Sequence, residues 1–315
     1  MPRSDLPPRD LETIARSYVP GAGALSIERL GSGLVNESYR AVRAGRCYSL
    51  RIPAPQREDL GLDRVWECRV LARAAAAGIA PVIERCEPLE GVLVARWVDG
   101  LSWTREQVRE PANIRAVALL ARRIHGLRIP EAPRRMSPAS WIAFYREALE
   151  RRDSAAGDAA AVDTAAVDSA AVYKGRRSWP ELEGGLAARS AALAALPGAP
   201  AVLCHSDLHV ANLVAGAGGL TLLDWEYAHV SEPLWDLAGW SCNNDLTAEA
   251  RHLLLASYLG RAPRDEEAER LDHLAWLYDY VCVLWSELFA ARGAAEGQRV
   301  ASRARALVER LRASA

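Results

Sequence analysis

The stretch from His205 to Ala228, HSDLHVANLVAGAGGLTLLDWEYA, is the most informative part of this sequence. Short apolar runs precede and divide it, and polar or ionisable residues stand at the ends of these runs. Short apolar runs bounded by turn residues are typical of buried strands. The stretch therefore predicts buried strands joined by a hairpin. Ionisable side chains at the ends of such strands indicate chemistry rather than simple solvation.

The ionisable residues of this stretch allow three interpretations. In the first, His205 and His209 hydrogen-bond a turn and have only a structural role. In the second, His205, Asp207 and His209 bind a metal ion for hydrolysis, because their alternate spacing on a strand would place them on one face. The sequence has no further cluster of histidine and aspartate that would complete such a metal site.

The third interpretation uses the whole spacing of the stretch. An aspartate on a loop after a buried strand, an asparagine five residues later and a second aspartate after a hairpin are typical of a kinase catalytic centre. Asp207 would accept the proton of a substrate hydroxyl, while Asn212 and Asp224 would bind Mg²⁺ ions that bridge the phosphates of ATP. The spacing suits this chemistry because base and metal ligands must converge on one phosphorus atom.

The first hundred residues predict a small antiparallel sheet. A short helix at 10–18 comes first, and a longer helix from Leu62 to Ala77 has apolar residues at helical spacing. Alternating apolar residues and turn residues indicate five strands, at 26–30, 35–42, 47–52, 81–85 and 91–97. We therefore expect a five-stranded sheet with one long helix, and we place the boundary of this lobe at residues 1–95.

Two features of this lobe favour the kinase interpretation. The glycine-bearing turn Gly31-Ser32-Gly33 lies between the first two strands, where it would cover nucleotide phosphates. Arg51 ends the third strand and Glu67 lies on the following helix, which is the order of the basic–acidic pair that orients the phosphates in kinases. Alone, such a pair would be an ordinary surface ion pair. Lys174 is the only lysine and lies far from every motif, so Arg51 would have to be the cation.

Beyond residue 100 the apolar spacing becomes helical, and we expect a larger α-rich lobe at 96–315. Its helices are expected near 114–124, 141–150, 247–259 and 268–291. Between 154 and 172 an Ala-Ala-Val-Asp unit repeats at a five-residue step, which matches neither the helical nor the strand period. The segment therefore cannot keep one apolar face, and we expect a peripheral insertion that is partly helical or mobile.

Composition excludes several classes of protein. Formal net charge is −1, with no basic patch for nucleic acid. The six cysteines are scattered without a C-x-x-C pair, which indicates reduced thiols. The N-terminus has no apolar signal core, and no apolar run reaches the length of a membrane span. We therefore expect a cytoplasmic monomer or homodimer that binds neither membrane nor nucleic acid.

With these motifs assembled, the chain resembles the aminoglycoside phosphotransferase and choline kinase superfamily, which implies an α+β, protein-kinase-like bilobal fold. The resemblance covers about residues 25–290 and rests on GSGLVNESYR, YSLRIP, the Glu67 helix, VLVARWVDG, HSDLHVAN, LLDWEYA and EPLWDLAGWSCNNDL. Ser206 stands where glycine is commoner, and Arg51 where many kinases carry lysine. No protein-kinase activation loop follows Asp224, which favours a small-molecule substrate.

The resemblance also implies the cofactors and the site. ATP and Mg²⁺ are the expected cofactors, with Asp207, Asn212 and Asp224 as catalytic residues and the last two as metal ligands. The adenine would lie against residues 94–98. The expected nucleotide-binding residues are Gly31, Ser32, Gly33, Asn36, Arg51, Glu67, Val94, Arg96 and Val98.

The substrate is indicated by an unusual ratio of ten Trp to two Phe. Tryptophan is the ring that best holds a quaternary ammonium by cation–π attraction, although most tryptophans are core residues. The expected substrate contacts are Asp207, Glu226, Trp225, Trp240 and Trp285. Choline is the expected substrate, with thiamine, ethanolamine, amino sugars and aminoglycosides as alternatives. A metal-dependent hydrolase and an ATP-binding pseudokinase are the alternatives outside the kinases.

Overall fold

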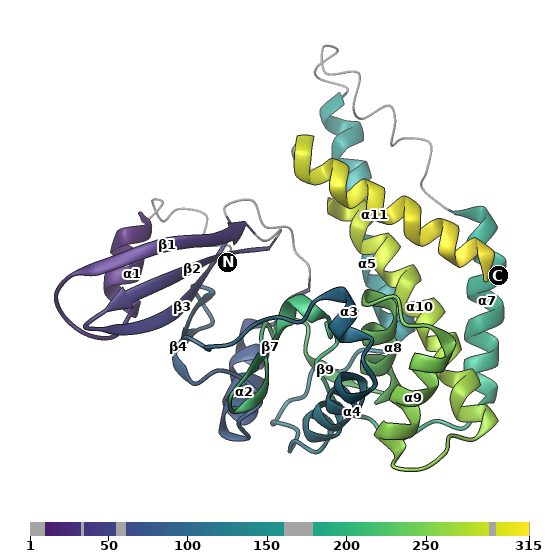
Figure 1. The fold of residues 1–315 in the computed structure, drawn as a ribbon. Coiled ribbons are helices and arrows are strands. Elements are labelled where there is room, and N and C mark those ends of the chain that lie inside the picture. The colour runs from purple at the N-terminus through teal and green to yellow at the C-terminus, as the bar shows by residue number, and fades with distance from the viewer. Residues whose placement is uncertain (1–9, 33–34, 55–60, 161–178, 290–293, 315) are drawn as a thin grey trace.

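The computed structural model describes residues 10–32, 35–54, 61–160, 179–289 and 294–314 (Figure 1). The N-terminal part is a five-stranded antiparallel sheet with the strand order β1-β2-β3-β5-β4. Its strands are β1 (Leu25–Ser32), β2 (Asn36–Arg43), β3 (Arg46–Pro53), β4 (Ile83–Glu87) and β5 (Val92–Arg96). This sheet confirms the prediction made from the apolar alternation.

The two faces of the sheet have different partners. The face with Leu50 and Val94 packs against α1 (Leu11–Tyr18), whose first turn is capped by the side chain of Asp10. Arg51 projects from the opposite face, because side chains alternate along a strand. On that side α2 (Arg64–Ala76) packs against β4 and begins where Asp63 accepts a 2.9 Å hydrogen bond from the backbone of Trp66. Alternation therefore turns Arg51 toward the α2 helix.

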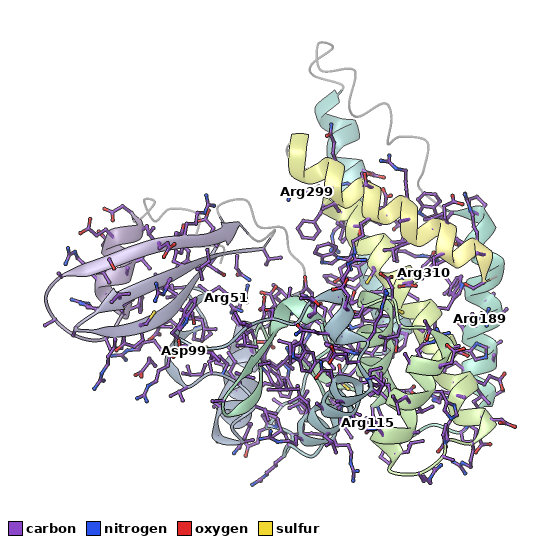
Figure 2. The ribbon with its side chains drawn as sticks, viewed as in Figure 1. Arg51, Asp99, Arg115, Arg189, Arg299 and Arg310 are labelled. Atoms are coloured by element: carbon purple, nitrogen blue, oxygen red, sulfur yellow. A yellow bond between two sulfur atoms is a disulfide. The ribbon has the colours of Figure 1, made fainter. Side chains whose placement is uncertain are left out.

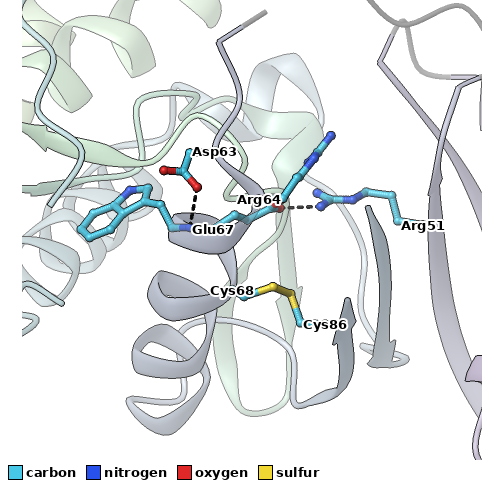
Figure 3. The surroundings of a disulfide bond; sticks show 7 residues. Arg51, Asp63, Arg64, Glu67, Cys68 and Cys86 are labelled. Atoms are coloured by element: carbon cyan, nitrogen blue, oxygen red, sulfur yellow. Dashed lines mark hydrogen bonds and ion pairs between the residues drawn. A yellow bond between two sulfur atoms is a disulfide. The ribbon is translucent and has the colours of Figure 1, made fainter. Parts of the chain in front are cut away.

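A disulfide joins α2 to the sheet. Cys68 of α2 is bonded to Cys86 of β4 (Figure 3). The expectation of six reduced thiols is therefore wrong for this pair, and the cysteines no longer indicate a cellular compartment. The error arose because the pairing partners are 18 residues apart and only the packing of α2 on β4 brings them together. The other cysteines, Cys47, Cys204, Cys242 and Cys282, are free.

The rest of the described chain is mostly helical, as predicted. Its helices are α3 (Arg105–Val108), α4 (Pro111–His125), α5 (Pro138–Ala160), α7 (Pro180–Ala195), α8 (Leu234–Asn243), α9 (Ala248–Leu259), α10 (Asp265–Phe289) and α11 (Ala294–Ala313). Helix α10 contacts α5, α7, α8 and α11, and is surrounded by them in Figure 1. Most side chains of α10 between Leu271 and Phe289 are therefore buried. A helix that is covered on all sides is expected to be apolar on most of its surface.

The alanine-rich segment begins as a continuation of α5. Residues 154–160 belong to this helix, which agrees with the high helix propensity of alanine. The remainder of the expected insertion, 161–172, lies outside the described residues. Among the helices that the structure describes, none combines the length and the apolar character needed to cross a bilayer.

Two short strand pairs lie between the sheet and the helices. Strands β7 (Leu213–Gly216) and β8 (Gly219–Leu222) form the predicted hairpin, and β6 (Val202–Cys204) pairs with β9 (His229–Ser231). The segment after β5 crosses this hairpin closely, so that a Cβ atom on Gly100 would lie 2.5 Å from the carbonyl oxygen of Ala215. Only glycine allows this approach. The division into 1–95 and 96–315 stays a prediction, and β5 itself ends at Arg96.

Candidate active site

The loop after β6 brings Asp207 and Asn212 together. The amide nitrogen of Asn212 donates to the Asp207 carboxylate at 2.9 Å and to the Asp207 carbonyl at 3.1 Å. Nε2 of His209 lies 3.4 Å from the same carboxylate. Burial raises the pKa of Asp207, but the His209 charge and the hydrogen bonds of His209 and Asn212 outweigh it and lower this pKa to about 2. Asp207 is therefore ionised at neutral pH and able to accept a hydrogen bond from a hydroxyl.

A buried carboxylate of α8 holds the backbone of this loop. Asp236 accepts hydrogen bonds from the backbone N–H of His205 at 2.9 Å and of Ser206 at 2.6 Å. Ser206 has a φ of 70°, a left-handed conformation that costs a residue with a Cβ about 1–2 kcal/mol. Nε2 of His125 lies 3.1 Å from Asp236 and completes its surroundings. These hydrogen bonds to the Asp236 carboxylate keep the strained turn before Asp207 in place.

His205 has a structural role. Its Nε2 donates to the carbonyl of Leu223 at 2.9 Å, and its Nδ1 accepts from the backbone of Asp207 at 3.2 Å. Both ring nitrogens are therefore occupied, and His205 cannot ligate a metal together with His209. The one group of three potential ligands in the described part of the chain is elsewhere, at His125, Cys204 and Asp236. The hydrolase interpretation has no support in this geometry.

Arg51 connects the sheet to α2 and to the loop after β8. Its guanidinium lies 2.6 Å from the carboxylate of Glu67 (Figure 3). It also lies 2.9 Å from the carboxylate of Asp224. In the view of the whole molecule, Arg51 lies on the side of the sheet that faces the helical part (Figure 2). The structure thus brings together the predicted basic–acidic pair and the second aspartate, from three separate elements.

Arg64 enlarges this cluster and was missed in the sequence. Its guanidinium donates to Glu67 at 2.8 Å, to Glu226 at 2.9 Å and to the side-chain oxygen of Asn36 at 2.9 Å. Asn36 in turn donates to Glu226 at 2.6 Å. The one signal in the sequence was the position of Arg64, three residues before Glu67 on the same helix. Glu226, expected to contact substrate, lies instead in this network.

The cluster is rich in negative charge. Its carboxylates outnumber its guanidinium groups: they are Glu67, Asp207, Asp224 and Glu226, against Arg51 and Arg64. Burial raises the pKa of Asp224, and the charges of Glu67 and Asp207 raise it further while Arg51 opposes them. For Glu226, burial and the Asp224 charge raise the pKa to about 7. Such crowding of carboxylates favours a bound cation.

The residues present fit Mg²⁺. Asp224 has a φ of 53°, so the chain turns sharply at this carboxylate. Asn212 uses its amide nitrogen on Asp207, which leaves its carbonyl oxygen for another partner. Carboxylate and amide oxygens are the ligands that Mg²⁺ prefers.

The other expected nucleotide residues lie around the sheet. Gly31 and Ser32 end β1 after an irregularity in its pairing with β2, whereas Gly33 lies outside the described residues. The Val94 side chain is fully buried on the α1 side of the sheet, opposite to Arg51. Arg96 is exposed and pairs with Glu84 at 2.7 Å. Val98, which follows β5, is partly buried. The geometry thus directs the side chains of Val94 and Arg96 away from the Arg51 face.

A pocket of about 590 Å³ opens beside Asp207. Its aromatic lining comes from α5, α8, α10 and the loop after β8: Trp141, Tyr145, Tyr227, Trp235, Tyr278 and Trp285. The indole N–H of Trp285 donates to the hydroxyl of Tyr227 at 3.0 Å, which fixes both rings. Of the expected substrate residues, Asp207 and Trp285 line this pocket.

Trp225 and Trp240 belong to the core. Both side chains have no exposed surface, and Trp225 donates to the carbonyl of Leu222 at 3.0 Å. The structural alternative therefore describes these two tryptophans better than a substrate contact does. Tyr227 and Tyr278 were missed, although Tyr278 lies two helical turns before Trp285 on α10 and so shares its face.

Comparisons with known proteins agree with this geometry. The family model described as "Phosphotransferase enzyme family" (APH) matches residues 26–274. A search of curated proteins finds no match. Among solved structures, a choline/ethanolamine kinase family protein from Mesorhizobium loti is 24% identical, with a TM-score of 0.66 over 94% of this chain and 90% of that chain.

Two further structures show the same fold at lower identity. An ethanolamine kinase of Plasmodium vivax is 17% identical, with a TM-score of 0.74 over 93% of this chain and 85% of that chain. The choline kinase LicA of Streptococcus pneumoniae is 19% identical, with a TM-score of 0.71 over 96% of this chain and 97% of that chain. LicA has also been solved in complex with AMP. By the family match and by its protein-kinase-like fold, this chain belongs to the phosphotransferase enzyme family and is a phosphotransferase.

Proposed function

We propose that this protein transfers the γ-phosphate of ATP to the hydroxyl of a small molecule, and that choline is its substrate. The observation that carries the kinase proposal is the convergence of Asp207, Asn212 and Asp224 with the Arg51–Glu67 pair. Base, metal ligands and a phosphate-orienting cation are the parts that phosphoryl transfer requires, since its catalysis is mainly positioning and charge stabilisation.

The nucleotide would bind on the Arg51 face of the sheet. Nε of Arg51 is buried and has no hydrogen-bond partner within the described residues. A phosphate oxygen would satisfy this N–H when the nucleotide binds, while Glu67 holds the other end of the guanidinium. Gly31 and Ser32 would cover the phosphates through their backbone, and the backbone after β5, including Val98, would receive the adenine. Mg²⁺, when bound at Asn212 and Asp224, would neutralise charge on the phosphates.

Asp207 would receive the substrate. Its ionised carboxylate accepts the hydrogen bond of the hydroxyl and so directs the oxygen toward the γ-phosphorus. The oxygen–phosphorus bond forms as the bond between the γ-phosphorus and the β–γ bridging oxygen breaks. The electron pair of that bond leaves with ADP, and the hydroxyl proton passes to Asp207. Asn212 keeps the carboxylate in place through its 2.9 Å hydrogen bond.

Choline is supported by the aromatic lining of the pocket. A quaternary ammonium cannot donate hydrogen bonds, so ring faces are its main partners. Trp285 and Tyr227 are joined to each other at the pocket wall. Trp141 is less suited, because the guanidinium of Arg134 already lies 5.0 Å from its ring centroid. Thiamine also has a quaternary nitrogen and a hydroxyl, and it is the alternative that fits the same rings.

The proposal is tested by measuring ADP formation with Mg-ATP and a panel of choline, ethanolamine, thiamine and an amino sugar. Asp207→Asn should lower kcat by about 10²–10⁴-fold, the usual contribution of a general base, while ATP binding measured by thermal shift persists. Asp272→Asn is the matched control, because Asp272 is exposed and does not line this pocket. Full activity in Asp207→Asn, or no phosphate transfer to any alcohol, would overturn the kinase proposal.

A further inference from the structure

The wall of the pocket formed by α11 is basic. Arg303 and Arg310 of α11 line the pocket together with Asp207, and Arg105 of α3 lies on the same lining. Figure 2 shows Arg310 on α11, beside α10. A guanidinium repels an ammonium group, so a pocket that binds only a cation would not be expected to have this wall. The substrate should have a second group that suits it.

Two of the three arginines are already neutralised. Arg310 lies 2.5 Å from the carboxylate of Asp279 and 3.0 Å from that of Asp245. Arg105 lies 3.5 Å from Asp245. These guanidinium groups therefore have carboxylate partners within the protein.

Arg303 forms no ion pair with a carboxylate of the described residues. In the part of the chain that the structure describes, its one hydrogen bond goes to the side-chain oxygen of Asn243, at 3.1 Å, and this acceptor is neutral. Arg303 is exposed on the pocket side of α11, so most of its N–H groups are free to donate. A guanidinium with free N–H groups binds a carboxylate through two parallel hydrogen bonds.

Asn243 places Arg303 close to the reacting centre. Its amide nitrogen donates to the hydroxyl of Tyr278 at 3.0 Å and to the carbonyl of Leu208 at 3.2 Å. Leu208 is the residue directly after Asp207, so a single side chain connects Arg303 to the loop that carries the base. The charge of Arg303 also acts on His209, where it opposes the effect of Asp207 on the pKa. A short molecule can therefore reach both Asp207 and Arg303.

The pocket has room for such a molecule. Its volume of about 590 Å³ lies within the range of about 300–1,000 Å³ that sites for drug-sized ligands have. A small ammonium head alone would leave much of this space to water.

We propose that the substrate is zwitterionic, with a hydroxyl at Asp207, an ammonium group at Trp285 and Tyr227, and a carboxylate bound by Arg303. This inference rests on the proposed kinase function, and it replaces choline as the preferred substrate by a choline-like alcohol that also carries a carboxylate. The phosphoryl transfer itself is unchanged. The carboxylate adds binding and orientation, and its charge offsets the basic wall.

The test compares alcohols that differ by one carboxylate. Choline is paired with N,N,N-trimethylserine and ethanolamine with serine, and kcat/KM is measured with Mg-ATP. Hydrogen bonds to charged groups contribute about 1.5–3 kcal/mol, so the carboxylated member of each pair should be preferred by about 10- to 150-fold. Arg303→Gln should abolish this preference, by lowering kcat/KM for the carboxylated member of each pair to the value of its partner. Arg305→Gln is the matched control, since Arg305 is exposed on the same helix and bonds Ser302.

Binding measured without ATP separates the two proposals. Isothermal titration should show that wild type binds N,N,N-trimethylserine more tightly than choline, and that Arg303→Gln binds both equally. If this binding result were obtained but no phosphate were transferred, carboxylate binding by Arg303 would be supported and the kinase function would be overturned. Equal kcat/KM within each pair, with equal binding, would overturn the zwitterion. If Arg303→Gln lowered kcat equally for both alcohols of a pair, Arg303 would act on the phosphate of ATP. That result would also overturn the zwitterionic substrate.

Discussion

Arg64, at the start of α2, donates a 2.9 Å hydrogen bond to the carboxylate of Glu226, 162 residues later in the chain. The same guanidinium holds Glu67, the partner of Arg51. The helix that carries Glu67 and the loop that carries Asp224 are therefore joined by one side chain. A shift of α2 would therefore disturb both the Arg51–Glu67 pair and the loop that carries Asp224.

Replacing Arg64 should weaken the use of ATP without touching the substrate pocket. Arg64→Gln should lower kcat/KM for ATP about tenfold or more, because hydrogen bonds to charged groups contribute about 1.5–3 kcal/mol. Arg64→Lys should retain part of the activity, because lysine keeps the positive charge but cannot donate to several acceptors in the fixed planar geometry of a guanidinium. Arg69→Gln, on the exposed side of α2, is the control. Steady-state kinetics in which Arg64→Gln behaves like Arg69→Gln would contradict this role.

Arg51→Ala should raise KM for ATP and also lower kcat. A misoriented phosphate loses transition-state stabilisation as well as binding, so both constants should change. Arg51→Lys should recover part of the loss. Arg46→Ala, an exposed position at the start of β3, should leave both constants near wild type. Unchanged ATP kinetics in Arg51→Ala would mean that the nucleotide phosphates lie elsewhere.

The Asp207–His209 pair should make stability depend on pH. Burial lowers the pKa of His209, but the Asp207 charge and hydrogen bond outweigh it, so this pKa lies above its ordinary value of about 6.5. The stabilisation is therefore fully present below about pH 6.5 and is lost as the pH rises through the higher folded-state pKa. Urea unfolding without nucleotide should show wild type more stable than His209→Asn at pH 6, with the difference shrinking toward pH 9. A difference that does not vary with pH would refute the charged pair.

Loss of the Cys68–Cys86 bond should destabilise the N-terminal sheet. The bond closes a loop of 18 residues, for which the chain-entropy estimate is about 3 kcal/mol. The double variant Cys68→Ser/Cys86→Ser should therefore have a lower free energy of unfolding, and wild type should lose a similar amount in reductant. Cys47→Ser, a free thiol, serves as the control. Identical unfolding of wild type with and without reductant would contradict the bond.

The two classes of tryptophan should respond differently to mutation. Trp285→Ala should lower kcat/KM for choline by about 2- to 30-fold, which corresponds to about 0.5–2 kcal/mol of cation–π attraction, while KM for ATP stays unchanged. Trp240→Ala should instead reduce stability by about 3–5 kcal/mol, the usual cost of deleting a buried large ring. Kinetics and thermal unfolding of both variants distinguish these outcomes. A Trp285→Ala enzyme with wild-type kinetics would remove the aromatic site from the proposal.

Local patterns predicted much of this protein, because they record the geometry of a single element. The apolar alternation of YSLRIP indicates a strand at 47–52, and the alternation of side chains along this strand puts Leu50 and Arg51 on opposite faces of the sheet. Asp207 and Asn212 lie five residues apart, so the turn between them suffices to bring their side chains to 2.9 Å. The same alternation directs the side chain of Val94 to the Leu50 face, away from the expected adenine site.

Contacts between distant segments were decided only by the packing of elements on one another. The amino-acid sequence was sufficient to predict the order of strands and helices along the chain, the hairpin, and the spacing of the base and the metal ligands. It did not show that Trp285 would line the pocket while Trp240 is buried, because both stand in similar apolar surroundings. Nor did it pair Arg64 with Glu226 or Cys68 with Cys86, or show that Arg303 has no ion pair among the described residues. Each of these depends on which helix faces lie together, and that is a property of the tertiary structure alone.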